Sequence, residues 1–344
     1  MSDELLLMRR ALELAVRGPA VDPNPRVGAV VTDRRGHIVG EGCHRGAGHA
    51  HAEVEALEAA GRAAIGGTAV VTLEPCDHRG RTGPCSQALL DAGVARVVYA
   101  QGDPSPEAAG GAARLGAGGV SVIGGVLADE AENINRAWTF AVTHGRPRVT
   151  WKFAATLDGR SAAADGSSQW ITGPTARADV HRLRAQAGAI LVGTGTVLAD
   201  DPRLTVRRPD GELVEHQPLR VVMGHRDLPV TSRVFDDAAP TLRLREHDPV
   251  RALAQLGDLG IRQVWLEGGP TLAAAFLHAG VVDEVIAYLA PTLLGSGRSA
   301  VGDLGITALG DALQLHPREI TTVGSDIRIR ASVTRALATT TSGA

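Results

Sequence analysis

Short apolar runs alternate with amphipathic segments along most of the chain. Residues 27–32 and 68–73 are almost continuously apolar and predict buried strands, whereas residues 3–17 carry apolar side chains at helical spacing. Repeated alternation of strands and helices is typical of proteins in which the two kinds of element form layers. The pattern therefore predicts an α/β fold.

The first 145 residues contain further signals of both kinds. The Asp-Arg-Arg-Gly sequence at residues 33–36 predicts a hairpin that joins the strand at 27–32 to a second strand at 37–42. The other elements expected in this half are helices at about 51–60, 85–92 and 127–140 and a strand at 96–100.

The chain changes character near residues 143–147, which have the sequence Thr-His-Gly-Arg-Pro. This glycine and proline end the preceding helix, and a new strand begins at 148–152. A chain of 344 residues with 44% hydrophobic content is too long for one ordinary core. We therefore expect two domains and a disordered tail, at residues 1–145, 146–335 and 336–344.

Two strands of the second half each end in a glycine turn. The strand at 189–192 is followed by Gly-Thr-Gly-Thr at 193–196, and the strand at 264–267 is followed by Gly-Gly-Pro-Thr at 268–271. Such turns can hold a phosphate, because glycine lets backbone N–H groups approach an anion. They also serve packing alone, and neither turn is the six-residue dinucleotide fingerprint. Both uses therefore remain open.

Composition narrows the class of partner. The formal net charge is −3 and only 3% of the residues are aromatic, which argues against a broad nucleic-acid surface and favours a small substrate. The first residues lack the apolar core of a secretory signal, and no run of 18 apolar residues occurs. Two of the three cysteines are expected to bind a metal as thiolates, as argued from their spacing below. We therefore expect a reducing, cytoplasmic location.

Four residues carry the clearest chemical signal: His51, Glu53, Cys76 and Cys85. One imidazole and two thiolates form the protein part of a catalytic zinc site and leave the fourth position to water, whose pKa the metal lowers to about 7. In zinc deaminases, a Glu two residues after the His shuttles protons without binding the metal. Glu53 has that spacing, and the helices expected at the His and at Cys85 would turn their positive ends toward the site. We therefore expect one zinc ion per chain.

Other interpretations of these residues remain open. Two cysteines and a histidine also occur as ordinary core residues, and a structural zinc normally has four protein ligands. Cys43, which follows an apolar run, is the candidate fourth ligand in that case. Eight residues separate Cys76 from Cys85, in place of the two in the usual deaminase pattern, so the loop between them is long and basic.

Residues 73–85 have the sequence Leu-Glu-Pro-Cys-Asp-His-Arg-Gly-Arg-Thr-Gly-Pro-Cys. Together with Pro-Asn-Pro at 23–25 and His-Ala-Glu at 51–53, this segment resembles the bifunctional riboflavin-biosynthesis deaminase/reductase. Segments of the second half resemble the reductase of that family in the same order, at residues 151–154, 156–160, 169–173, 183–185, 195–205 and 267–272. The resemblance covers about residues 5–332. It implies a cytidine-deaminase-like α/β/α domain followed by a dihydrofolate-reductase-like domain.

The resemblance also implies two reactions. The first half would release ammonia from 2,5-diamino-6-(5-phosphoribosylamino)pyrimidin-4(3H)-one and give the 5-amino-uracil analogue. The second half would then reduce the ribosyl group to ribityl with NADPH. The partner would be this small phosphorylated pyrimidine, with no nucleic acid and no membrane. We also expect a homo-oligomer, whose number of subunits the sequence leaves open.

The resemblance also implies roles for individual residues of this chain. For the substrate, the resemblance implies contacts by Asn24, His44, His78, Arg81, Ser168, Arg184, Leu204, Arg207 and Glu267. For NADPH, it implies contacts by Ala154, Trp170, Thr196, Asp200 and the turn from Gly269. Reduction also needs a cation or proton donor at the developing oxyanion, and Lys152 is our candidate. Each role has an ordinary structural alternative. His44 and His78 could be surface histidines, Lys152 could point outward from its strand, and the arginines could be solvated surface charges.

Two positions depart from the family pattern. Ser105 stands where the family commonly has Asn, which shortens the reach of a side chain expected to face the substrate. Met-Gly-His at 223–225 stands where an Asp-Ser pair often follows the strand near the cofactor, so the grip on the NADPH 2′-phosphate is unassigned. Two rival functions remain: a deaminase of another nucleobase or nucleotide with a degenerate reductase-like domain, and a non-enzymatic, zinc-stabilised binding protein.

Overall fold

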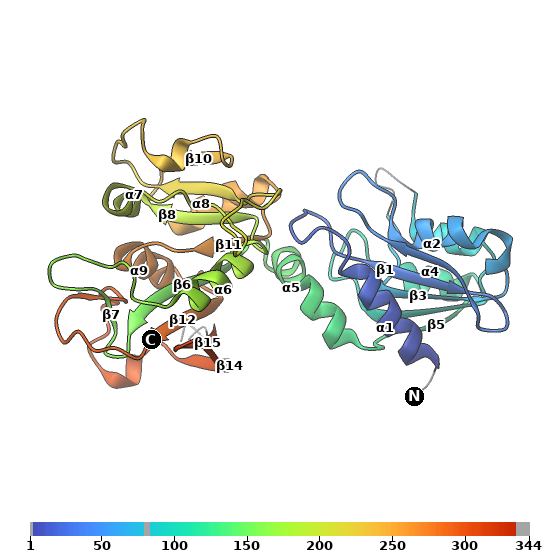
Figure 1. Cartoon of the computed structure of the whole chain (residues 1–344). Coiled ribbons are helices and arrows are strands. Elements are labelled where there is room, and N and C mark those ends of the chain that lie inside the picture. Colours follow the sequence, from blue (N-terminus) through green and yellow to red (C-terminus); the bar gives the residue numbers. More distant parts are fainter. Residues whose placement is uncertain (1–2, 79–82, 335–344) are drawn as a thin grey trace, which may run out of the picture. The chain divides into compact units, whose positions relative to one another are not determined.

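A computed structural model describes residues 3–78 and 83–334 of the chain (Figure 1). Arg81 and the tail expected at 336–344 lie outside these residues. The chain divides into two compact units, Met1–Arg146 and Pro147–Ala344. Each unit has its own sheet and its own core.

The first unit is built on a five-stranded sheet in the order β2-β1-β3-β4-β5. β1 pairs antiparallel with β2 and β3, whereas β3, β4 and β5 are parallel. The strands are β1 (Gly28–Thr32), β2 (Ile38–Cys43), β3 (Thr68–Leu73), β4 (Arg96–Gln101) and β5 (Ser121–Ile123). The hairpin predicted at residues 33–36 therefore joins β1 to β2.

Helices cover both faces of this sheet. Val30 and Val31 are neighbours in β1 but belong to different core clusters, because successive strand residues point to opposite faces. One cluster joins the sheet to α2, α3 and α4, and the other joins it to α1 and α5. The helices are α1 (Asp3–Ala15), α2 (Ala52–Ala60), α3 (Cys85–Asp91), α4 (Gly111–Ala117) and α5 (Ala128–His144), with a short 3-10 turn, η1 (Gly61–Ala64).

Glycines in β2 let α2 approach the sheet closely. A β-carbon at Gly40 would lie 2.1 Å from the carbonyl oxygen of Ala56, and one at Gly42 would lie 2.2 Å from that of Ala52. Any side chain at these positions would push the helix away. This contact fixes the first turn of α2, on which Glu53 lies.

The second unit is built on an eight-stranded sheet in the order β10-β9-β8-β11-β6-β12-β15-β14. The strands from β10 to β12 are parallel, and β15 and β14 add an antiparallel pair. The strands are β6 (Arg148–Thr156), β8 (Ala189–Gly193), β9 (Leu219–Met223), β10 (Thr241–Leu244), β11 (Gln263–Leu266), β12 (Glu284–Ala290), β14 (Leu315–Val323) and β15 (Asp326–Val333). β7 (Arg160–Ala162) and β13 (Arg298–Ser299) form a separate two-stranded sheet.

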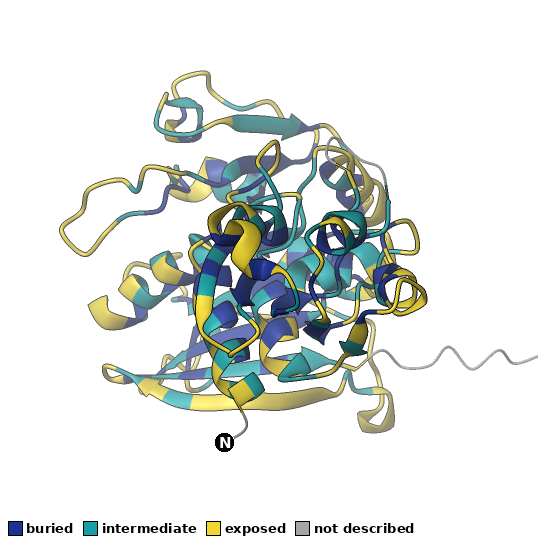
Figure 2. Cartoon of the chain, turned by 90° about the vertical axis from the view of Figure 1, so that its right-hand side faces the viewer, coloured by how far each residue is buried: buried dark blue, intermediate teal, exposed yellow. Residues whose placement is uncertain are grey.

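This larger sheet also lies between two helical layers. Leu191 packs in the cluster that contains residues of α8 and α9, whereas its neighbour Ile190 packs with residues of α6 and α7. The helices are α6 (Pro174–Arg184), α7 (Thr194–Asp200), α8 (Pro249–Asp258) and α9 (Pro270–His278), with 3-10 turns η2 (Arg233–Phe235) and η3 (Leu309–Asp311). Buried residues gather in the strands and on the inner sides of the helices (Figure 2). The expected α/β architecture is confirmed.

The predicted elements differ from the observed ones mainly at their ends. The first helix ends at Ala15 rather than at residue 17, and the strand that begins at Arg148 continues to Thr156 rather than to residue 152. Its extension matters, because Lys152 and Ala154 therefore lie within a central strand. Among the described residues, no helix is both long and apolar enough to cross a membrane.

Candidate functional site

The first unit brings His51, Cys76 and Cys85 together. His51 precedes the first residue of α2, Cys76 follows the end of β3, and Cys85 begins α3. Nδ1 of His51 lies 3.2 Å from Sγ of Cys85 and 3.6 Å from Sγ of Cys76. The three donor atoms lie within 4.8 Å of one another. Two sulfurs and one ring nitrogen at this separation fit a metal ion of the zinc type.

Hydrogen bonds favour the thiolate form of Cys76, whereas the hydrogen bond with Cys76 and burial raise the pKa of the Cys85 thiol. Cys76 is 7% exposed and Cys85 is fully buried. Hydrogen bonding from Cys85, with a further contribution from His51, lowers the pKa of the Cys76 thiol to about 4. The backbone N–H of Cys85 also donates to Sγ of Cys76 at 3.5 Å. Cys76 therefore offers a thiolate at neutral pH.

Cys43 lies apart from this group. Among the described residues, the group able to hold a metal consists of the three residues above. Cys43 ends β2, where its backbone N–H donates to Glu55, and its side chain packs in the cluster on the other face of the sheet. A four-ligand site completed by Cys43 is therefore wrong.

Glu53 lies beside the three donor residues, in the first turn of α2. Its side chain is almost completely buried, with 5% exposed. Burial raises the pKa of its carboxyl group, while the charge of His51 opposes this effect. A carboxyl group with a raised pKa can take up and release a proton near neutral pH.

Asn24 and His44 complete one side of this site. Nδ2 of Asn24 lies 3.1 Å from Nε2 of His44, and Nδ1 of His44 lies 2.9 Å from the carbonyl oxygen of Ala50. The ring of His44 meets that of His51 edge to face, with centroids 5.4 Å apart. His44 is 5% exposed, so the surface alternative for this histidine is wrong.

The loop between the cysteines carries His78 and Arg81. Nδ1 of His78 is buried and has no hydrogen-bond partner among the described residues. A buried polar atom without a partner is costly in a folded protein, so it suits a group that a ligand completes. Arg81 lies outside the described residues.

Residues that sequence reasoning missed hold a second loop against the metal ligands. The Glu74 carboxylate accepts hydrogen bonds from the backbone N–H groups of Asp103, Gly110 and Ala112 at 3.3, 3.3 and 3.1 Å. Ala108, from the same loop, packs against both cysteines. Its carbonyl oxygen accepts from the N–H of Asp77 at 2.9 Å. The position of Glu74 directly before the Pro-Cys motif was the available signal.

Ser105 lies in this second loop, and its backbone is held by its neighbour. The N–H of Ser105 donates to the carboxylate of Asp103 at 2.8 Å. Burial raises the pKa of Asp103, an effect that this hydrogen bond opposes. The loop that carries the departure from the family pattern therefore has a defined turn.

The second unit contains a cluster of charged residues at its sheet. Lys152 lies on β6, Arg184 ends α6 and Glu267 follows β11. Nε of Arg184 donates to Oε1 of Glu267 at 2.8 Å, and Nη2 pairs with Oε2 of the same carboxylate. Their side chains are 15% and 9% exposed, so Arg184 is not a solvated surface charge. The family resemblance implies that both residues contact the substrate.

Lys152 is embedded among these charges. It is half-buried, and burial lowers the pKa of its ammonium group, an effect that Glu267 opposes and Arg184 reinforces. Burial disfavours the carboxylate of Glu267, yet Arg184 and Lys152 hold its pKa at about 2. Lys152 therefore interacts electrostatically with the Arg184–Glu267 pair, which favours an inward-facing position over an outward-facing strand lysine.

His181 also belongs to this cluster, although no sequence pattern indicated it. Burial, followed by the charge of Arg184, lowers its pKa to about 4, so the imidazole is neutral at pH 7. Its Nδ1 accepts the backbone N–H of Arg207 at 3.2 Å. Nη1 of Arg184 donates to the carbonyl oxygen of Thr205 at 3.3 Å. Leu204 is buried next to Thr205, whose hydroxyl is buried without a partner among the described residues.

The two glycine turns adjoin each other at the ends of neighbouring strands. Gly269 precedes α9, and a β-carbon placed on it would lie 4.0 Å from the hydroxyl oxygen of Thr196. Asp200 ends α7, and burial raises the pKa of its carboxyl group. Three of the predicted cofactor residues are therefore close to one edge of the sheet, with Ala154 on β6.

Ser168 and Trp170 lie on the loop that follows β7. The Trp170 ring is 68% exposed, and the guanidinium of Arg177 lies 4.5 Å from its centroid. Within residues 3–78 and 83–334, no hydrogen bond or ion pair joins Ser168 or Trp170 to the charged cluster. Their assignments therefore rest on the resemblance alone.

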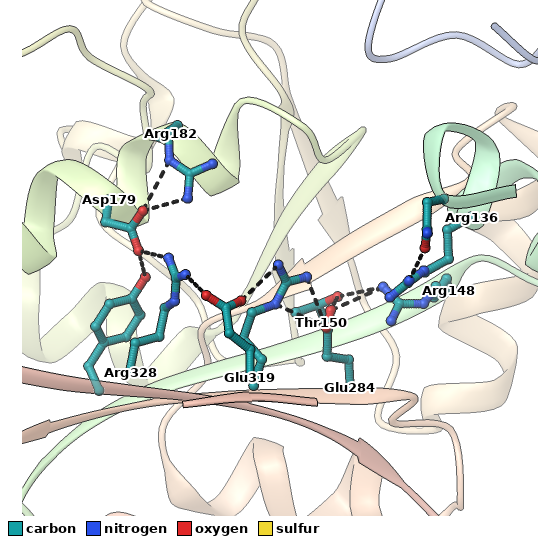
Figure 3. Close-up of polar contacts among 11 residues, drawn as sticks. Arg136, Arg148, Thr150, Asp179, Arg182, Glu284, Glu319 and Arg328 are labelled. Atoms are coloured by element: carbon teal, nitrogen blue, oxygen red, sulfur yellow. Dashed lines mark hydrogen bonds and ion pairs between the residues drawn. The ribbon is translucent and has the colours of Figure 1, made fainter. Parts of the chain in front are cut away.

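A chain of ion pairs fixes the helix that carries His181 and Arg184. Asp179 on α6 accepts from the hydroxyl of Tyr288 at 2.6 Å and pairs with Arg328 at 2.5 Å (Figure 3). The chain of alternating charges continues through Glu319, Arg330, Glu284 and Arg148. It joins α6 to strands β12, β15, β14 and β6, so the helix cannot shift without breaking several contacts.

Both halves match families of known proteins. The model of the cytidine and deoxycytidylate deaminase zinc-binding region matches residues 1–101. The model of the RibD C-terminal domain matches residues 147–329, which is more than half of the chain.

Individual relatives match over nearly the whole chain. Riboflavin biosynthesis protein RibD of Mycobacterium tuberculosis is 53% identical over 306 residues, which are 89% of this chain and 90% of the relative. The solved structure of Acinetobacter baumannii RibD superposes with a TM-score of 0.87 at 38% identity and covers 97% of this chain and 99% of its own. A diaminohydroxyphosphoribosylaminopyrimidine deaminase/5-amino-6-(5-phosphoribosylamino)uracil reductase from Thermotoga maritima gives 0.86 at 32% identity and covers 96% and 99%.

Proposed function

Because the chain belongs to the RibD family of bifunctional riboflavin-biosynthesis enzymes, we propose the substrates and residue roles of its two reactions. The deaminase unit releases ammonia from 2,5-diamino-6-(5-phosphoribosylamino)pyrimidin-4(3H)-one. The reductase unit then converts the ribosyl group of the product to ribityl with NADPH. The observation that carries this proposal is the joint presence of an open His-Cys-Cys donor group with a buried carboxyl group and of a charged cluster beside two glycine turns.

In the deaminase, His51, Cys76 and Cys85 would hold one zinc ion, which supplies a water of lowered pKa for attack on the amino-bearing ring carbon. Glu53 takes the proton of that water and delivers it to the departing amine. Its burial supports this role, because a raised pKa lets the carboxyl group act in both directions. Asn24 and His44 orient the ring, and His78 and Arg81 hold the polar groups and the phosphate of the substrate.

In the reductase, NADPH would supply the hydride for C1′ of the opened ribose. Lys152 donates the accompanying proton or stabilises the negative charge that develops as C1′ is reduced. The substrate phosphate and hydroxyl groups are held by Ser168, Arg184, Leu204, Arg207 and Glu267. The cofactor is held by Ala154, Trp170, Thr196, Asp200 and Gly269. Burial of Lys152 supports its role, because a lowered pKa makes its proton easier to transfer near neutral pH.

The division of labour between residues 1–145 and 146–335 belongs to the same proposal. A fragment that starts at Arg146 should fold and oxidise NADPH when it receives the already deaminated ribosylamino-uracil phosphate. It should release no ammonia from the diaminopyrimidine, because all three proposed metal ligands precede residue 86. A folded but inactive fragment would contradict the division.

The deciding experiment uses the full chain and the diaminopyrimidine phosphate, with and without NADPH. Ammonia should appear in both reactions, and the NADPH absorbance should fall only after ammonia release has begun. Ammonia without NADPH oxidation would instead favour a deaminase with a degenerate partner domain. Absence of both activities in zinc-loaded protein would favour a zinc-stabilised binding protein. The cytoplasmic location and the homo-oligomer stay predictions.

A further inference from the structure

The parallel strands β9, β8, β11 and β6 present their carboxyl ends along one edge of the reductase sheet. Hydride transfer near Lys152 places the nicotinamide beside β6. The glycine turns after β11 and β8 follow next in this row, and their backbone N–H groups suit a pyrophosphate. A dinucleotide laid along the edge therefore brings its adenosine to the end of β9.

Arg226, just beyond the end of β9, lies directly against the turn that follows β8. Its Nε donates to the hydroxyl oxygen of Thr194 at 3.2 Å. A β-carbon at Gly195 would lie 2.7 Å from Nη2 of Arg226, so the glycine leaves room for the guanidinium to lie over the turn. Within the described part of the chain, Arg226 forms no ion pair with a carboxylate. Its charge is therefore available to a ligand.

A second arginine and two histidines lie close to Arg226. Arg243 donates to the carbonyl oxygen of Arg226 at 3.1 Å and fixes its backbone. The rings of His225 and His247 lie with centroids 4.6 Å apart. The nearby acids have other partners: Asp227 pairs with Arg245 at 3.0 Å, and Glu246 accepts the backbone N–H groups of His247 and Asp248 at 2.7 and 2.9 Å.

We infer that Arg226 recognises the 2′-phosphate on the adenosine of NADPH and makes the reductase prefer NADPH to NADH. The inference rests on the proposed reductase function. A guanidinium matches the geometry of a phosphate monoester, and an arginine at the adenosine end is one way in which dinucleotide sites accept the 2′-phosphate. In this chain Arg226 directly follows the Met-Gly-His segment at 223–225, so the guanidinium takes over the grip that the departure had left unassigned.

The test compares 2′,5′-ADP with 5′-AMP, because these probes differ only in the 2′-phosphate. Calorimetric titration of the full chain should show that 2′,5′-ADP binds more tightly. Arg226→Met should weaken 2′,5′-ADP by about 10- to 100-fold and leave 5′-AMP within about twofold. The KM for NADPH should rise by the same factor while that for NADH stays unchanged. Arg226→Lys should restore part of the preference.

Arg245→Met is the matched control, because it removes the same charge from the neighbouring strand end, where Arg245 pairs with Asp227. A loss of preference equal to that of Arg226→Met would replace direct recognition by general electrostatics and overturn the inference. Retention of the wild-type preference by a folded Arg226→Met protein would overturn it too, as would equal use of NADH and NADPH by the wild type. In each of these cases the reductase function stands. A wild-type protein that oxidises neither cofactor and binds neither probe would overturn the reductase function itself.

Discussion

The two sites of this chain reach their charge balance in opposite ways. The deaminase site gathers two thiols, an imidazole and a buried carboxyl group, and it needs a cation to neutralise them. The reductase cluster contains its own counter-charges, because Glu267 is paired with Arg184 and faces Lys152. The first site should therefore depend on an added ion for its order, whereas the second should be ordered by the protein alone.

The largest expected effect is the loss of the metal. Cys85→Ser should remove zinc and abolish ammonia release, a greater loss than any single proton-transfer residue causes, while NADPH oxidation with the deaminated substrate continues. Metal analysis and the two activity assays measure this. Cys43→Ser is the matched control and should keep both zinc and activity, because Cys43 packs away from the donor group. Zinc loss in the Cys43 variant would restore the four-ligand alternative.

Glu53→Gln should separate the metal from the proton shuttle. The variant should keep zinc but lose about 10²- to 10⁴-fold in the rate of deamination, because the amide cannot carry the proton. Removal of a buried acid should also leave the reductase rate unchanged. Ammonia release near the wild-type rate would show that another group moves the proton.

Lys152→Met should lower the rate of reduction by about 10²-fold, at the lower end of the range for a proton donor. The lowered pKa of Lys152 also predicts how the rate of reduction changes with pH. Because burial lowers the pKa of Lys152 below its usual 10.5, the donor form is present at low pH and is lost as pH rises through the lowered value. The wild-type rate should therefore fall on an alkaline limb below pH 10.5, and the Met variant should lack that limb. An identical limb in the variant would assign it to another group.

The last expected effect concerns Arg184 and falls on substrate binding rather than on the rate of reduction. Arg184→Met should raise the substrate KM by an amount equivalent to about 1.5–3 kcal/mol, with NADPH affinity nearly unchanged. It should also lower the thermal stability of the reductase unit, because Glu267 is left buried without its partner. Adding Glu267→Gln should recover stability but not KM. A KM that recovers with stability would reduce Arg184 to a structural role, and a parallel loss of NADPH affinity would move it to the cofactor site.

The same contrast explains what the sequence could predict. The metal donors stand at residues 51–85, and each lies at the boundary of a helix or strand that a local pattern marks. Local spacing was therefore enough to foresee their meeting. Lys152, Arg184 and Glu267 lie on three separate elements, and the order of strands in the sheet brings them together. Arg184 and Glu267 were indicated only by the family resemblance, and Lys152 was a hypothesis based on the chemistry of reduction.

Contacts between residues that belong to no recognised motif could not be predicted from the sequence. His181 is one histidine on an amphipathic helix, and nothing nearby in the sequence signals that its half-buried ring interacts with the charge of Arg184. Arg226 was hidden for a similar reason, since its contact with Thr194 joins the ends of two neighbouring strands. Asp103 and Ala112 meet Glu74 through a loop whose path no periodic pattern describes.

The position of β15 has a consequence for how the protein is made. This strand, which ends at Val333, lies inside the reductase sheet between β12 and β14. The reductase sheet is therefore incomplete until residue 333 has left the ribosome, whereas the deaminase sheet already closes with β5 at Ile123. Since domains generally fold from the N-terminus as synthesis proceeds, a nascent chain acquires its metal-binding half first. A truncation that removes β15 should thus abolish one activity of the pair and spare the other.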